Sequence, residues 1–282
     1  MNKNDTKNEV WTVKRVLHWL TQKFKHEGFK NPRLESEIAV AKAIKGDRVK
    51  VYIELEKPLT ESERSILRQI TRRRLAREPY AYILGHKEFF SLDFKVNKNV
   101  LIPRPETELM IEEALKHIKP GQKILDVGTG SGAIAVSLAV NTTDVSVFAS
   151  DISEEALKIA TENAKRYKVE IKFFKGSLFE PFQGKKFDLI MANLPYIPTD
   201  YVLPEDVAYE PESALFSGED GLDLIRKFLF ELPNFIENNG IVFMEFGDNQ
   251  KQKINEILIK YGYNFEFYRD LANAYRFVKI LF

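Results

Sequence analysis

The stretch ILDVGTGSGAIAVSLA, Ile124 to Ala139, joins a short apolar run, a glycine-rich turn and a second apolar segment. The first run predicts a buried strand, and the segment after the turn predicts a helix. Glycine has no Cβ, so Gly128, Gly130 and Gly132 permit a tight turn and a close approach of the backbone to a ligand. We therefore expect a strand–turn–helix unit that binds a ligand at its turn.

Segments typical of strands continue to alternate with helical segments on the C-terminal side of this unit. Such alternation indicates a parallel sheet with helices on both faces, and thus an α/β fold. The tail YNFEFYRDLANAYRFVKILF offers two more strands joined by a short turn, which predicts an antiparallel edge pair. The other strand candidates are KILDV, VSVFAS, VEIKFF, FDLIMA and GIVFMEF.

The first part of the chain is predicted to be helical, because its apolar residues recur at helical spacing. Thr60 and Glu63 have the spacing of a capping box, and Asn31 before Pro32 predicts another helix start. The alternating stretch that follows, with NKN at a turn, predicts a hairpin. The expected division is a helical domain over 1–85, a hairpin linker over 86–100 and an α/β domain over 101–282.

Composition excludes several classes of protein. The 282 residues include 42 basic and 41 acidic ones, and a net charge of +1 does not favour a broad electrostatic grip on nucleic acid. Cysteine is absent and the four histidines share no ligand-like spacing, so we expect no metal site. No apolar signal-peptide core or membrane span is recognisable, which predicts a soluble, cytoplasmic protein.

Two carboxylates flank the glycine turn. Its spacing is G-x-G-x-G rather than the dinucleotide fingerprint, and Asp126 just before it would repel a pyrophosphate but suits a cation. Asp151 ends the next strand, where an acid can hold ribose hydroxyls, although an N-cap of the following helix is an alternative role. Two acids without a phosphate-binding lysine fit S-adenosylmethionine. Leu178 and Ser177 would flank its adenine, or else form an ordinary turn.

The fourth predicted strand ends in Asn193-Leu194-Pro195-Tyr196. A carboxamide nitrogen is a poor nucleophile, and an enzyme helps by accepting both of its hydrogens. The Asn193 side-chain oxygen and the Leu194 carbonyl are suited to this, while Tyr196 can stack on the flat amide. This would be catalysis by orientation and preorganised electrostatics. Taken alone, the motif is more often a structural turn, but it gains weight beside a G-x-G-x-G loop.

DVGTGSG, NLPY and above all LIPRPETE, Leu101 to Glu108, resemble the protein N5-glutamine methyltransferases that act on peptide-chain release factors. The resemblance extends over the whole chain. It implies a class I S-adenosylmethionine-dependent methyltransferase with a seven-stranded, mostly parallel, doubly wound sheet and a small helical N-terminal domain. The implied reaction methylates the glutamine side chain of the Gly-Gly-Gln motif in class-one release factors and leaves S-adenosyl-L-homocysteine.

The resemblance also assigns residues. Asn193 and Tyr196 would be catalytic, and no metal would take part. Those implied to bind the substrate are Asn193, Leu194, Pro195, Tyr196, Arg104 and Glu106, the last two in the signature loop, where an interdomain salt bridge is an equal alternative. Those implied to bind the cofactor are Asp126, Gly128, Thr129, Gly130, Ser131, Gly132, Asp151, Ile152, Ser177, Leu178 and Asn193.

One position departs from the family's N-P-P-Y motif, because Leu194 replaces the first proline. Any residue supplies a carbonyl, so we expect the acceptor to survive while some rigidity is lost. Pro195 still biases residue 194 toward extended geometry. We predict retained but weaker catalysis.

Two other functions compete with this one. An adenine-N6 nucleic-acid methyltransferase would use the same motif on a flipped base. The neutral charge, the lack of a basic recognition domain and LIPRPETE argue against it, and no direct nucleic-acid substrate or membrane partner is expected. A nonenzymatic binding module would bind the cofactor without turnover.

Overall fold

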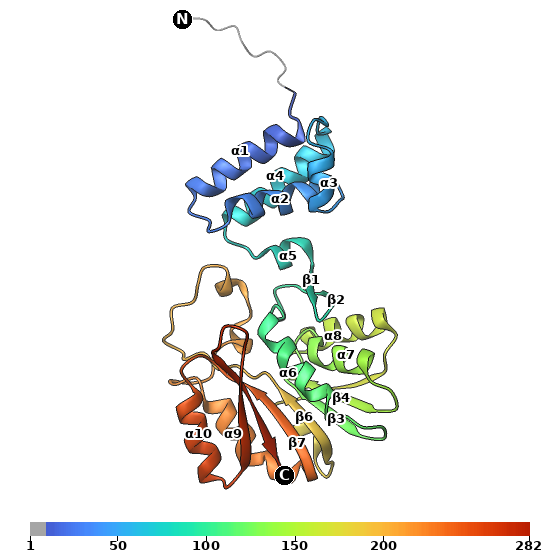
Figure 1. The fold of residues 1–282 in the computed structure, drawn as a ribbon, viewed down its shortest axis with the longest axis vertical. Coiled ribbons are helices and arrows are strands. Elements are labelled where there is room, and N and C mark those ends of the chain that lie inside the picture. The colour runs from blue at the N-terminus through green and yellow to red at the C-terminus, as the bar shows by residue number, and fades with distance from the viewer. Residues whose placement is uncertain (1–9) are drawn as a thin grey trace, which may run out of the picture. The chain divides into compact units, whose positions relative to one another are not determined.

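The computed structural model describes residues 10–282, which form two compact units, residues 10–84 and Gly85–Phe282 (Figure 1). The first unit is helical. Thr60 Oγ1 accepts from the Glu63 amide at 3.2 Å and Glu63 accepts from the Thr60 amide at 2.7 Å, which confirms the capping box. Asn31 makes no side-chain cap. The helices are α1 (Val13–His26), α2 (Pro32–Ala43), α3 (Arg48–Ile53), α4 (Glu61–Leu75) and α5 (Tyr80–Leu84).

The second unit begins with the predicted hairpin, formed by antiparallel β1 (His86–Phe89) and β2 (Leu92–Lys95). Its turn lies at Phe90 and Ser91, which both have positive φ. NKN lies at a second turn, after β2, where the Val100 amide donates to the Asn97 carbonyl at 3.1 Å, which confirms a turn at this position. The sequence did not reveal the turn between the two strands, because two non-glycine residues adopt the left-handed conformation there.

A seven-stranded sheet forms the centre of the second unit, in the order β5-β4-β3-β6-β7-β9-β8. The first five strands in that order are parallel, and β9 runs antiparallel to both of its neighbours, as the sequence predicted for the tail. The strands are β3 (Lys123–Val127), β4 (Ser146–Asp151), β5 (Ile171–Lys175), β6 (Phe187–Ala192), β7 (Ile236–Glu245), β8 (Asn264–Arg269) and β9 (Tyr275–Leu281).

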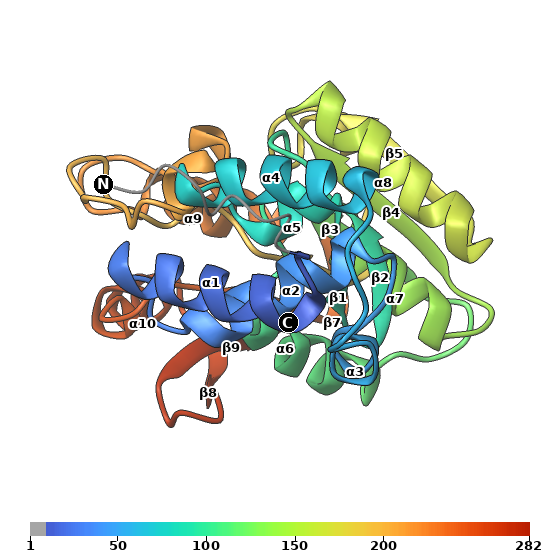
Figure 2. The same cartoon turned by 90° about the horizontal axis from the view of Figure 1, so that it is seen from above.

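Helices cover both faces of the sheet. Figures 1 and 2 show α7 and α8 together beside β3 and β4, and α9 and α10 together on the opposite side. The helices are α6 (Pro105–Leu115), α7 (Ala133–Asn141), α8 (Glu154–Tyr167), α9 (Asp223–Glu231) and α10 (Lys251–Lys260). Short 3-10 helices are η1 (Glu180–Phe182), η2 (Val207–Tyr209), η3 (Glu212–Ala214) and η4 (Leu232–Asn234).

The register of the sheet separates an apolar face from one that carries acids. Leu125, Ile190, Val242 and Ile280 are cross-strand partners and belong to one buried cluster with residues of α9 and α10. Successive side chains of a strand point to opposite faces, so the neighbour Asp126 lies on the other side. The chain leaves β3 in one direction and returns to β6 on its other side, which is where open α/β sheets bind ligands.

Candidate active site

The glycine loop between β3 and α7 has the conformation that its sequence requires. Gly128, Gly130 and Gly132 all have positive φ, at 74°, 54° and 80°. A Cβ on Gly130 would meet no atom within 4 Å, so the backbone there borders open space. A Cβ on Gly132 would lie 3.1 Å from the Ala160 Cβ, so close packing against α8 requires a glycine at this position.

Asp151 fastens this loop from the end of β4. One carboxylate oxygen accepts from the Gly130 amide and the other from the Ser153 amide, each at 2.8 Å. The N-cap of α8 is Ser153, whose hydroxyl accepts from the Ala156 amide at 3.2 Å, so the N-cap interpretation of Asp151 was wrong. Burial raises the pKa of Asp151.

Asp126 lies beneath the loop, fully buried. Its Oδ2 accepts from the Thr129 hydroxyl at 2.6 Å and from the Ala135 amide at 3.2 Å. Within residues 10–282 its Oδ1 has no hydrogen-bond partner. Burial raises the pKa of Asp126 to about 7. The position makes Asp126 a brace for the loop rather than part of the pocket wall.

A main pocket opens beside the loop at the carboxyl ends of β3, β4 and β6. It brings together most of the residues that the sequence assigned to the cofactor, including the apolar Ile152 and Leu178. Thr129 and Ser131 instead line an adjoining loop hollow, which also reaches Thr107. The assigned residues that line the main pocket are Gly128, Gly130, Asp151, Ile152, Ser177, Leu178, Asn193, Leu194 and Pro195.

The walls of the main pocket suit S-adenosylmethionine. A carboxylate stands at the strand end where a ribose would lie, and the backbone at Gly130 is left bare for close approach. Leu178 is only 6% exposed and offers an apolar wall. The carboxylate can accept hydrogen bonds from the hydroxyls of a ligand, and the apolar wall suits a flat base.

Asn193 follows β6 directly and lies where three hollows meet. It lines the main pocket, the loop hollow and a third one, the aromatic hollow, which contains Tyr196, Tyr201 and Leu203. Because Val127 pairs with Ala192, Gly128 and Asn193 leave the sheet at the same level. The Asn193 Nδ2 donates to Thr107 Oγ1 at 3.2 Å.

The two predicted acceptors are unengaged. Among the residues that the structure describes, none donates a hydrogen bond to Asn193 Oδ1 or to the Leu194 carbonyl. The Leu194 side chain is 3% exposed and packs under the glycine loop, where a Cβ on Gly128 would lie 3.4 Å from its Cδ2. Packing therefore replaces part of the rigidity that a proline ring would give.

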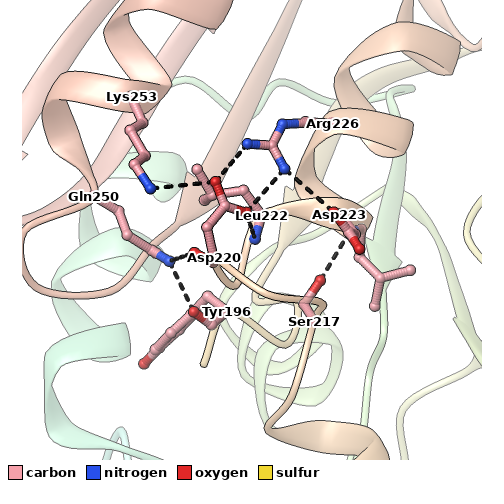
Figure 3. Close-up of polar contacts among 9 residues, drawn as sticks. Tyr196, Ser217, Asp220, Leu222, Asp223, Arg226, Gln250 and Lys253 are labelled. Carbon is pink, nitrogen blue, oxygen red and sulfur yellow. Dashed lines mark hydrogen bonds and ion pairs between the residues drawn. The ribbon is translucent and has the colours of Figure 1, made fainter. Parts of the chain in front are cut away.

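Tyr196 is held at both ends. Its hydroxyl donates to Glu245 Oε1 at 3.4 Å, and its carbonyl accepts from Gln250 Nε2 at 2.8 Å. Figure 3 shows Gln250 also reaching the Asp220 carbonyl, while the Asp220 carboxylate is bound by Arg226 and Lys253. The turn after Asn193 is thereby tied to α9 and α10.

The signature loop is partly helical, because Glu106 belongs to the first turn of α6 and lines none of the three hollows. Arg104 borders the loop hollow and the aromatic hollow and forms a 2.5 Å ion pair with Glu210. Glu210 also accepts from the Ile102 amide at 3.0 Å. Both partners belong to the second unit, so the interdomain salt bridge was wrong for Arg104.

Four residues of the site received no individual role from the sequence: Thr107, Glu210, Glu245 and Gln250. Glu245 is 1% exposed and accepts from the Thr107 hydroxyl at 2.5 Å. For Glu245 and Gln250 the sequence held a signal, because an acid follows apolar residues at the end of the fifth predicted strand, and a glutamine comes five positions later.

Residues 10–282 contain no group of three or more histidine or acidic side chains placed for a metal ion. Nor is any helix there long and apolar enough to cross a membrane.

Comparison with known proteins agrees with this geometry. Residues 15–85 match the family described as PrmC N-terminal domain, and residues 105–204 match the methyltransferase small domain. A release factor glutamine methyltransferase of Geobacter sulfurreducens is 40% identical and covers 91% of this chain and 92% of its own. Another, of Thermodesulfovibrio yellowstonii, is 36% identical, and the match covers 86% of this chain and 90% of that protein.

A solved structure supports the fold alone. A methyltransferase from Pyrococcus furiosus superposes with a TM-score of 0.55 at 21% identity, covering 75% of this chain and 98% of that one. This confirms the expected class I methyltransferase sheet, and helices α1 to α5 form the expected helical N-terminal region. With identity that high to the Geobacter protein over nearly the whole length, the chain belongs to the release factor glutamine methyltransferase family.

Proposed function

We propose that the protein transfers a methyl group from S-adenosylmethionine to the side-chain nitrogen N5 of the glutamine in the Gly-Gly-Gln motif of class-one release factors. The observation that carries the proposal is the pair of unengaged acceptors, Asn193 Oδ1 and the Leu194 carbonyl, at the junction of the main pocket and the aromatic hollow. A primary amide has two N–H donors, so the two acceptors match it.

The acceptors act on the reactivity of the amide. An amide nitrogen delocalises its lone pair into the carbonyl, and accepting both hydrogens holds the nitrogen in place and favours pyramidal geometry. The acceptors are fixed before the reaction, so no reorganisation is required during it. The nitrogen loses a proton only after it gains the methyl carbon, so no general base is needed before attack.

S-adenosylmethionine supplies an electrophilic methyl carbon on a sulfonium when it occupies the main pocket, and S-adenosyl-L-homocysteine is what remains. Asp151 would hold the ribose hydroxyls and the backbone at Gly130 would lie against the ligand. Ile152 and Leu178 would flank the adenine. These assignments rest on the pocket lining and on the family membership of the chain.

The aromatic hollow would take the glutamine. It is lined by apolar and aromatic side chains, and Arg104 contributes the charged group at its edge. Tyr196, tied by Glu245 and Gln250, gives a fixed ring beside the amide. The release factor is the proposed partner, and a cytoplasmic location follows from that partner.

Mass spectrometry of a release factor incubated with enzyme and cofactor tests the proposal. A single added methyl group on the glutamine of Gly-Gly-Gln is the expected result, and Asn193→Ala should lower turnover by about 100-fold or more. Cofactor affinity, measured by calorimetry, should change little in that variant. A duplex DNA substrate serves as the comparison, and methylation of DNA adenine but not of glutamine would overturn the proposal.

A further inference from the structure

Three side chains from separate parts of the sequence, two of them buried, form a hydrogen-bonded chain that ends at the site. Asn193 Nδ2 donates to Thr107 Oγ1 at 3.2 Å, and the Thr107 hydroxyl donates to Glu245 Oε2 at 2.5 Å. Thr107 comes from α6 and is 3% exposed, and Glu245 ends β7 and is 1% exposed. Neither Thr107 nor Glu245 is among the residues assigned to the substrate or to the cofactor.

The charge of Glu245 decides the direction of every bond in this chain. An ionised carboxylate only accepts, so the Thr107 hydroxyl must give its proton to Glu245. Thr107 Oγ1 can then only accept from Asn193, and the NH2 end of the Asn193 amide must face it. The opposite end, Oδ1, is left for the aromatic hollow and the main pocket.

Protonation of Glu245 removes this constraint. A carboxylic acid can donate to Thr107, whose hydroxyl is then free to donate to Asn193 Oδ1. The amide of Asn193 could rotate by half a turn at no cost in hydrogen bonds. Its NH2 would then face the site, where two donors would oppose the N–H groups of an incoming amide.

We propose that Glu245, acting through Thr107, is a positioning residue that fixes which end of the Asn193 amide faces the substrate. The inference rests on the proposed glutamine methylation for its consequence, but the orientation itself belongs to the unliganded protein. Asn193 touches the reacting group, whereas Thr107 and Glu245 act only by holding it.

The surroundings of Glu245 place its ionisation near neutrality. Burial raises the pKa of Glu245 to about 7, and the neighbouring Glu106 carboxylate acts in the same direction. Arg276 of β9 and the hydroxyls of Thr107 and Tyr196 favour the charged form. The productive orientation is therefore enforced above about pH 7 and relaxed below it.

Enzyme kinetics provide the first test. Thr107→Val removes the hydroxyl at nearly constant volume and should lower kcat by about 10-fold to 100-fold, since misplacement of a reacting group has costs of that order. Thr107→Ser keeps the hydroxyl and should restore most of kcat. Cofactor affinity should stay unchanged in both. Thr161→Val, on α8, is the matched control and should behave as wild type.

The pH profile separates positioning from mere structural support. Wild-type kcat should rise with pH around 7, and Glu245→Gln, which cannot ionise, should lose that acidic limb, whereas Asp126→Asn should keep it. A Thr107→Val variant with wild-type kcat, or a Glu245→Gln variant with the acidic limb intact, would overturn the proposal. Thermal unfolding checks that each variant is folded.

A spectroscopic test needs no release factor. The side-chain NH2 signals of Asn193, assigned by their loss in Asn193→Ala, should shift with pH around 7 in the wild type and stay constant in Glu245→Gln. A wild type whose Asn193 signals do not titrate sinks the positioning role even if glutamine is methylated. Titrating signals without methylation of any release factor would instead remove the proposed function and leave the positioning role standing.

Discussion

The side-chain amide of Gln250 donates a 2.8 Å hydrogen bond to the carbonyl of Tyr196, and the same nitrogen lies 3.3 Å from the carbonyl of Asp220 (Figure 3). Gln250 Oε1 accepts from the Gly247 amide at 2.8 Å. One buried side chain thus joins the turn after β6, the segment before α9 and the start of α10. A Cβ on Gly221 would come within 2.1 Å of the Tyr196 carbonyl, so the packing around this link is tight.

Replacing Gln250 by Glu should damage both stability and catalysis. A carboxylate would face two carbonyl oxygens without a donor between them, which costs about 1–3 kcal/mol of unfolding free energy. The Tyr196 turn would shift, so turnover should fall more than cofactor affinity. Urea unfolding and steady-state kinetics measure the two effects. Gln252→Glu, exposed in the first turn of α10, should change neither by much, and equal losses in both variants would discount the link.

Asp151→Ala should weaken cofactor binding by about 10-fold to 100-fold, because hydrogen bonds to a charged group are worth roughly 1.5–3 kcal/mol. It also frees the Gly130 amide, which loosens the loop. Isothermal titration with S-adenosyl-L-homocysteine measures the affinity. Glu154→Ala removes an exposed acid of α8 as a control. Equal affinity in Asp151→Ala and the wild type would remove the ribose assignment.

Leu194→Pro tests the departure from the family motif. Within residues 10–282 the Leu194 amide donates no hydrogen bond, so proline removes none there, and its fixed φ should raise turnover or lower the KM for the release factor. Unchanged turnover and KM would show that the rigidity argument is wrong and that Leu194 does not weaken catalysis. Leu194→Ala leaves a cavity in the buried cluster and should cost about 2–5 kcal/mol of stability in urea unfolding.

Stability should fall as pH rises from about 5 to 7.5. Burial raises the pKa of both Asp126 and Glu245 to about 7, so the native state keeps protons that the unfolded chain has already lost. Under linkage, each such group lowers the unfolding free energy by up to about 1.4 kcal/mol per pH unit in that window. Asp126→Asn should flatten the slope relative to wild type in urea unfolding across the pH series. A slope identical to wild type would contradict the raised pKa.

Local patterns in the sequence predicted most of the fold. The period of apolar residues separated the helical N-terminal region from the alternating strands, and the capping box at Thr60 and Glu63 followed from spacing alone. Short elements escaped because they lack a full period. Helices α3 and α5 are brief, and α6 begins inside the predicted signature loop, Leu101 to Glu108.

The sequence by itself determined an α/β sheet and an amide at the end of a strand. It also determined a glycine turn with one acid just before it and another at the end of the next strand. Only tertiary structure decided which face each polar group occupies and what it touches. Asp126 and Asp151 are the same residue type in the sequence, yet Asp126 is fully buried beneath the loop whereas Asp151 borders the main pocket. Thr107 and Glu245 stand 138 positions apart and share one hydrogen bond. Sequence spacing fixes distances along a strand or helix, whereas contacts between elements arise only when the sheet register and helix packing are in place.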